Sequence, residues 1–154
     1  MPARPFVRSA GTFVLGTFII FSACERSAEG ADSGPRLLEL DSSSIDLPDS
    51  VRLVIVGLDR ALTSDMDPAE VEVVVGDIVR FQARDGAAHA IGFDGTGLTP
   101  EARRFLEVTG QMRSPPLVSA DRAWVVSFGN APPGDYPYTC VTHGAAGRIV
   151  VQPR

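Results

Sequence analysis

Turn-forming residues interrupt the chain so often beyond residue 50 that only short elements fit between them. The sequence contains 15 Gly and 12 Pro, and these residues separate one short apolar run from the next. Runs of this length suit β-strands, whereas helices need about ten residues or more. The predicted strands are 51–56, 71–75, 78–81, 88–93, 124–128, 136–140 and 149–151.

One stretch between the fourth and fifth predicted strands has a different pattern. Thr99 offers a capping hydroxyl, Pro100 stands at the first helical position, and Glu101 places an acid in the first turn. Apolar residues follow as far as Leu106, so we predict a short helix. Many short strands with one inserted helix predict an all-β fold, a β-sandwich or flattened barrel, in a single domain of residues 51–154.

The charge pattern excludes one class of partner. Acidic residues outnumber basic ones 19 to 14, and every basic residue is an arginine. The arginines are scattered and form no cationic stripe that could follow a phosphate backbone. We therefore expect no nucleic-acid partner. An acidic surface of this kind either steers a basic protein partner or simply keeps the chain in solution.

The N-terminal residues have the pattern of an export signal. Two arginines precede an apolar run at 10–21, and two small residues then lead into Cys24. This predicts a signal peptide of residues 1–23, because the apolar run is too short for a membrane-spanning helix. The four residues ending at Cys24 also resemble a bacterial lipobox, with Phe21 in place of the usual Leu, which predicts lipidation of Cys24. The alternative is a plain secretory signal with an incidental cysteine.

Residues 24–50 are rich in Ser, Asp and Glu and predict a flexible tether. Together with the signal peptide they predict a protein that is secreted across the inner membrane into the periplasm or cell envelope. A lipid on Cys24 would anchor it to the membrane.

Cys140 has no disulfide partner if Cys24 is lipidated, although an exported chain meets an oxidising compartment. Metal ligation is a good reason to keep an unpaired thiol there. His143 follows three residues later, and a single tight turn can aim both side chains at one point. His89, the remaining histidine, lies where a loop enters a predicted strand. Two imidazoles and one thiolate form the trigonal donor set that suits blue copper.

At these residues the sequence resembles the cupredoxins of the plastocyanin and azurin type. The resemblance runs from about residue 68 to residue 151 and is most specific at the pattern Tyr-x-Tyr-x-Cys-x-x-His over Tyr136–His143, paired with the upstream His89. It implies a Greek-key β-sandwich and one copper ion that alternates between Cu(I) and Cu(II). The ligands that the resemblance implies are His89, Cys140 and His143. It also implies a non-enzymatic protein that carries single electrons between redox proteins such as a cytochrome or an oxidase.

The sequence departs from the cupredoxin pattern at three places. The axial Met or Gln is replaced by Arg148 or by Ala145, depending on the alignment, and neither side chain suits copper. The resemblance then leaves two alternatives, a three-coordinate site or one with an azurin-like long contact from the carbonyl of Ala88. Ala90 replaces the Asn whose hydrogen bond ties the two ligand loops together, and residues 141–142 replace the usual Pro or Gly between Cys and His.

The two ligand loops are rich in small residues, which predicts a flat patch around His143 where a partner could approach. The alternative is that short loops simply contain small residues. The residues concerned are Ala87, Ala88, Ala90, Gly144, Ala145 and Ala146.

Other functions fit the sequence less well. A copper oxidase would need further histidines, structural zinc would need a fourth ligand, and a Cys140–His143 nucleophile pair lacks an orienting acid or amide at motif spacing. The alternative that stays open is a periplasmic copper-handling protein that delivers or buffers the ion. Such proteins usually expose Met or Cys, of which the mature chain has little beyond Met66 and Met112.

Overall fold

The computed structural model describes residues 37–40, 43–62 and 65–154. All of them belong to one compact unit, Gly34–Arg154. The predicted signal peptide, Cys24 and the first part of the predicted tether lie outside the described residues. Among the residues described, there is no helix with the length and apolar character needed to cross a membrane.

Part of the predicted tether has regular structure. β1 (Leu37–Leu40) pairs antiparallel with β2 (Ser43–Asp46), with Leu38 opposite Ile45. The two strands form a small two-stranded sheet, in which Leu38 is buried. Two short strands thus lie within the predicted tether, and the role of residues 24–50 as a flexible tether stays a prediction.

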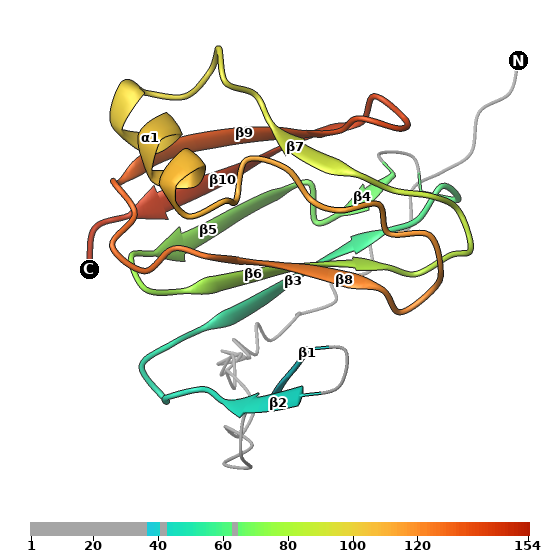
Figure 1. Ribbon diagram of the computed structural model, residues 1–154, viewed down its shortest axis with the longest axis horizontal. Helices are drawn as coiled ribbons and strands as arrows, with labels where there is room; N and C mark the ends of the chain where they lie inside the picture. Colours follow the sequence, from blue (N-terminus) through green and yellow to red (C-terminus); the bar gives the residue numbers. More distant parts are fainter. Residues whose placement is uncertain (1–36, 41–42, 63–64) are drawn as a thin grey trace, which may run out of the picture. The chain divides into compact units, whose positions relative to one another are not determined.

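Two four-stranded sheets make up the rest of the β structure (Figure 1). Sheet I has the order β4-β3-β6-β8, and sheet II has the order β5-β10-β9-β7. The strands of sheet I are β3 (Leu53–Leu58), β4 (Met66–Asp67), β6 (Ile78–Ala83) and β8 (Ala123–Ser127). Those of sheet II are β5 (Glu70–Val74), β7 (Ile91–Phe93), β9 (Gly134–Cys140) and β10 (Ala146–Gln152).

The chain passes repeatedly from one sheet to the other. Within sheets I and II, only β3–β4 and β9–β10 are consecutive strands of the same sheet. Because the other connections cross between the sheets, two neighbouring pairs are parallel, β3 with β6 and β5 with β10. The remaining neighbours are antiparallel. This confirms the predicted all-β sandwich, in which strands exchange between two packed sheets as in Greek-key folds.

The predicted helix is present as α1 (Pro100–Val108), inserted between β7 and β8. The Thr99 hydroxyl accepts a hydrogen bond from the Ala102 amide at 3.2 Å and so caps the first turn, as the sequence predicts. Ala102 and Leu106 are its buried residues. Figure 1 shows α1 at the opposite end of the sandwich from the loop that joins β9 to β10.

Alternation along β9 directs the end of this strand into the core. Tyr136, Tyr138 and Cys140 are all buried, while the residues between them are more exposed. The Tyr138 ring packs edge-on against Phe81 of sheet I, with 5.0 Å between the ring centroids. Each large side chain buried in this way stabilises the sandwich by roughly 1.5–3 kcal/mol. Cys140 therefore ends a rigid, well-packed strand.

The start of β10 requires a glycine for a steric reason. A Cβ at Gly147 would collide with the carbonyl of Ala69 and with the ring of Tyr138. The Tyr138 hydroxyl donates a hydrogen bond to that same carbonyl at 3.0 Å, so the ring cannot move aside without losing the bond. Gly147 thus lets the β9–β10 hairpin close tightly behind Cys140.

Candidate metal centre

The structure brings together the three residues that the sequence singles out as ligands. The ligand atoms of His89, Cys140 and His143 all lie within 4.8 Å of one another. His89 comes from the loop between β6 and β7, Cys140 is the last residue of β9, and His143 lies in the β9–β10 loop. Among the described residues this is the one group of three or more His, Cys, Asp or Glu side chains with such an arrangement.

The Nδ1 atom of each ring faces the thiol. Cys140 Sγ lies 3.6 Å from His143 Nδ1 and 3.9 Å from His89 Nδ1. The two imidazole planes are nearly perpendicular, at 82°, and their centroids are 4.9 Å apart. Cys140 and His89 are fully buried, whereas His143 is partly exposed.

These separations suit a single metal ion between the three atoms. Bonds of about 2.0–2.1 Å to nitrogen and 2.3 Å to sulfur, spread by roughly 110–120°, place the nitrogen and sulfur about 3.6–3.8 Å apart. The distance of 3.6 Å to His143 lies within this range, and that of 3.9 Å to His89 is about 0.1 Å longer, so an ion fits without large movements of the chain. Two imidazoles with one thiolate form a soft donor set that copper accepts in both oxidation states.

Both the amide and the carbonyl of His89 form hydrogen bonds with the segment that precedes β8. The His89 amide donates to the Leu117 carbonyl at 2.9 Å, and the Leu117 amide donates back to the His89 carbonyl at 2.8 Å. Two residues further on, Ile91 and Ser114 are linked in the same way, through the Ser114 hydroxyl and amide. Residues 112–117 therefore run along the free edge of β7 and fix His89 before the strand begins.

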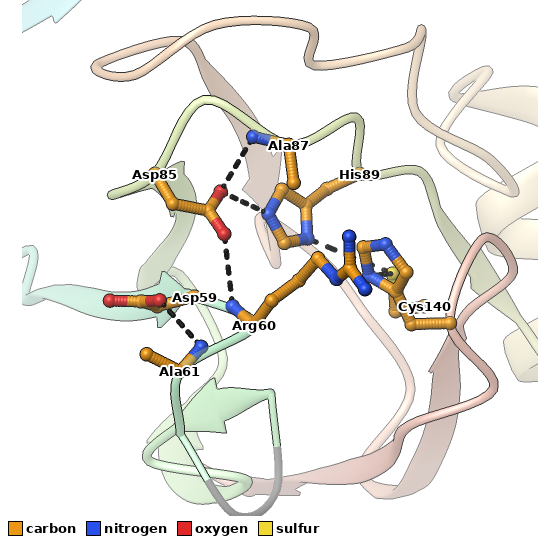
Figure 2. A network of polar contacts seen from close by, with 8 residues as sticks. Asp59, Arg60, Ala61, Asp85, Ala87, His89 and Cys140 are labelled. Carbon is orange, nitrogen blue, oxygen red and sulfur yellow. Dashed lines mark hydrogen bonds and ion pairs between the residues drawn. The ribbon is translucent and has the colours of Figure 1, made fainter.

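The ring of His89 has a second polar partner on the side away from Cys140. Its Nε2 lies 2.7 Å from Asp85 Oδ1 (Figure 2). The same carboxylate accepts hydrogen bonds from the amides of Arg60 at 3.0 Å and Ala87 at 3.1 Å. These bonds, that from Arg60 most strongly, hold the pKa of Asp85 at about 2, so the group is a carboxylate at neutral pH. A carboxylate only accepts, so Nε2 carries the donated proton and leaves Nδ1 for the metal.

Sequence reasoning missed the contact between Asp85 and His89. Their spacing of four residues is the one signal in the sequence, and that spacing has no fixed meaning in a loop. The carboxylate also reaches the Arg60 amide, 25 positions away, which no local pattern indicates.

The loop that carries His143 is a tight turn closed by backbone bonds. The Gly144 amide donates to the Cys140 carbonyl at 2.7 Å, and the Cys140 amide donates to the Ala145 carbonyl at 2.7 Å. Gly144 has a φ of +77°, a conformation that glycine adopts without steric cost. A single turn thus aims Cys140 and His143 at one point, as their spacing predicts.

The two ligand loops are tied together in spite of the alanine at position 90. The Val141 amide donates to the Ala90 carbonyl at 2.7 Å, and next to this bond Ile91 of β7 pairs with Cys140 of β9. A backbone hydrogen bond therefore joins the loops where the sequence predicts a missing side-chain bond.

The positions considered for an axial ligand contribute no side-chain donor. Arg148 forms an ion pair with Glu70 at 3.1 Å. Ala145 packs against the core and has no donor atom in its side chain. Ala88 is exposed, and a contact between its carbonyl and a metal stays a prediction.

The fold and the cluster define a β-sandwich protein with a His-Cys-His group at one end. No family model matches the chain. No curated protein matches it either. Solved structures that do match are cupredoxins, the family that the sequence resembles.

The purple cupredoxin from Nitrosopumilus maritimus is 20% identical, with a TM-score of 0.49 over 64% of this chain and 99% of that one. An oxidized mutant of amicyanin is 23% identical, with a TM-score of 0.47 over 65% of this chain and 82% of that one. A Cu(I) form of another amicyanin mutant is 24% identical, with a TM-score of 0.47 and the same coverage of 65% and 82%. Similarity at this level does not identify the bound metal, so the metal has to be inferred from the chain's own residues.

Proposed function

We propose that this protein binds one copper ion as a type 1 centre and carries single electrons between redox proteins. The observation that carries the proposal is the arrangement of the three donor atoms. Two imidazole nitrogens lie 3.6 and 3.9 Å from one thiol, at the end of a packed sandwich, in the chemistry that blue copper requires.

Bound copper would supply the electron chemistry, by alternating between Cu(II) and Cu(I). The chain's residues contribute a donor set that stays in place. Cys140 belongs to a packed strand, and the His89 backbone is bonded to Leu117 in both directions. Ligands that do not rearrange on a change of charge keep the reorganisation energy small, which favours fast transfer.

Electrons would enter and leave through His143. Cys140 and His89 are buried, so the partly exposed His143 ring is the ligand that reaches the surface. Its near neighbours in the chain include Gly144 and Val141, both exposed, the latter by 46%. Small and apolar side chains allow a partner to approach closely, which supports a redox protein as the partner rather than a small substrate.

The cellular setting follows from the sequence. The signal pattern of residues 1–23 supports export to the periplasm or cell envelope, and a lipid on Cys24 would hold the protein at a membrane. The scattered arginines support a protein partner and not a nucleic acid. The proposed role is that of a carrier and not of an enzyme.

Titration of the purified protein with Cu(II) tests the proposal, followed by visible absorbance and electron paramagnetic resonance. We expect an intense thiolate-to-copper band that saturates at one equivalent, bleaches reversibly with ascorbate and is absent in a Cys140→Ser control. Binding without that band, or release of copper on reduction, would overturn the electron-carrier function and favour copper delivery or buffering.

A further inference from the structure

Asp85 joins two loops that approach the metal cluster from different strands. It lies in the β6–β7 loop, four residues before His89, and its Oδ2 atom accepts the amide of Arg60 from the β3–β4 loop at 3.0 Å. Its Oδ1 atom accepts the amide of Ala87 at 3.1 Å and contacts His89 Nε2 at 2.7 Å. Two backbone amides therefore hold the carboxylate in place, independently of its contact with the histidine.

The contact between Asp85 and His89 involves a buried ring. The side chain of His89 has no solvent exposure, and that of Asp85 is 22% exposed. A charged hydrogen bond to a buried ring is stronger and better oriented than one in water. Figure 2 shows the ring between the two groups, with one nitrogen toward Asp85 and the other toward Cys140.

We propose that Asp85 is a positioning residue of the proposed copper centre, which holds the His89 ring with Nδ1 toward Cys140 and lowers the reduction potential of the copper. The inference rests on the proposed copper site and adds a residue that controls it. An anion bonded to Nε2–H makes the imidazole a stronger electron donor. A stronger donor stabilises Cu(II) more than Cu(I), because Cu(II) carries the larger charge, and the reduction potential falls.

The Asp85 carboxylate gains influence on the metal because the chain lacks an axial side-chain ligand. The side chains at the axial positions contribute no donor, so the ligands that tune the copper are the three in the cluster. The His89 ring contacts the Asp85 carboxylate, whereas the His143 ring has its hydrogen-bond-range contact with the Cys140 thiol. A substitution of Asp85 should therefore change the Cu(II) affinity and the reduction potential more than a substitution of any other acidic residue.

The test compares Asp85→Asn with Asp94→Asn. Asp94 provides a matched control, because it accepts hydrogen bonds from Thr96 in a similar loop turn but follows the opposite end of β7. Both variants remove one negative charge and keep an acceptor oxygen. The measurements are the Cu(II) affinity, the reduction potential and the visible spectrum of each copper-loaded protein.

We expect Asp85→Asn, which removes the charge behind the His89 ring, to weaken Cu(II) binding by about 10–100-fold, the usual cost of mutating the hydrogen-bond partner of a metal-ligating histidine. Each tenfold loss of Cu(II) affinity relative to Cu(I) raises the potential by about 59 mV. Asp85→Glu, which keeps the charge, should recover part of the Cu(II) affinity and bring the potential part of the way back to the wild-type value. Asp94→Asn should match the wild type in both. Equal potentials and affinities in Asp85→Asn and Asp94→Asn would overturn the inference while leaving the copper site intact.

A measurement on the wild type keeps the inference testable if Asp85→Asn does not fold. In the diamagnetic Cu(I) protein, nuclear magnetic resonance should show a slowly exchanging His89 Nε2 proton with the downfield shift of a hydrogen bond to a carboxylate. An Nε2 proton that exchanges as fast as that of His143 would refute the role of Asp85. A wild type that never develops the thiolate-to-copper band would instead refute the proposed function itself.

Discussion

His89 and His143 bring the same ring to one cluster, yet the protein holds them in opposite ways. His89 is buried, its backbone is bonded to Leu117 in both directions, and its far nitrogen contacts Asp85. His143 is partly exposed on a short turn, and its ring has the Cys140 thiol as its polar contact among the described residues. The difference indicates a division of roles, in which the buried histidine fixes the geometry and the exposed one connects the site to a partner.

Removal of each ring should give the largest effect and the sharpest test of this difference. His89→Ala and His143→Ala should both lose the thiolate-to-copper band. Millimolar imidazole should restore the band in His143→Ala, because solvent reaches that position, but not in His89→Ala, where the gap lies in the core. Visible absorbance during an imidazole titration measures this. Equal rescue of the two variants would show that the two histidines are equally accessible.

Truncation of Leu117 should weaken the support of the buried histidine. Leu117 is 2% exposed, so Leu117→Ala should lower the free energy of unfolding by about 2–4 kcal/mol and loosen the segment bonded to His89. The neighbouring Val118→Ala is the matched control, because Val118 is 62% exposed and should change stability by less than about 0.5 kcal/mol. Urea denaturation of the metal-free proteins measures both. Similar values for the two variants would contradict the support attributed to Leu117.

The carboxylate beside His89 predicts a pH dependence of the free energy of unfolding. The pKa of Asp85 is about 2 in the folded protein against an ordinary 3.8, so its ionised form stabilises the fold above pH 4. That contribution is lost as the pH falls through about 2. Wild type should therefore exceed Asp85→Asn by about 1–2 kcal/mol above pH 4, after allowance for partial exposure, and the difference should vanish toward pH 2. Denaturation at several pH values measures it, and a constant difference would contradict it.

A similarly small effect is expected on the turn that carries His143. Gly144→Ala forces an alanine into a positive φ of +77°, at a cost of about 1–2 kcal/mol, with no atom within 4 Å of the new Cβ. Gly86→Ala in the loop that carries His89 also meets open space, without a positive φ, and should be neutral or slightly stabilising. Thermal unfolding of both variants tests this. Equal stabilities would show that the turn tolerates alanine.

The part of the site that the sequence predicts is the part built from neighbours in the chain. Cys140 and His143 are three residues apart in one turn, so their convergence follows from spacing alone. Strands β3, β5 to β10 and the helix likewise have local signals in turn residues and capping. β4 has only two residues and leaves no pattern to detect.

The parts that were missed depend on contacts between distant segments. Leu117 lies 28 positions after His89, and the Arg60 amide that fixes Asp85 comes from another sheet connection. The bond between Val141 and Ala90 uses backbone atoms, which every residue possesses, so no side chain announces it. The anchoring of a ligand thus emerges from the packed sandwich and not from its own motif.

The complete burial of the Cys140 sulfur has a consequence for the protein before it meets copper. A lone thiol in an oxidising compartment is exposed to cross-linking with other thiols and to stepwise oxidation, and both reactions require access to the sulfur. Cys140 has no exposed surface, because the core lies behind it and the two imidazoles lie in front. The fold thereby protects the thiol of the metal-free protein and disfavours a covalent dimer through Cys140.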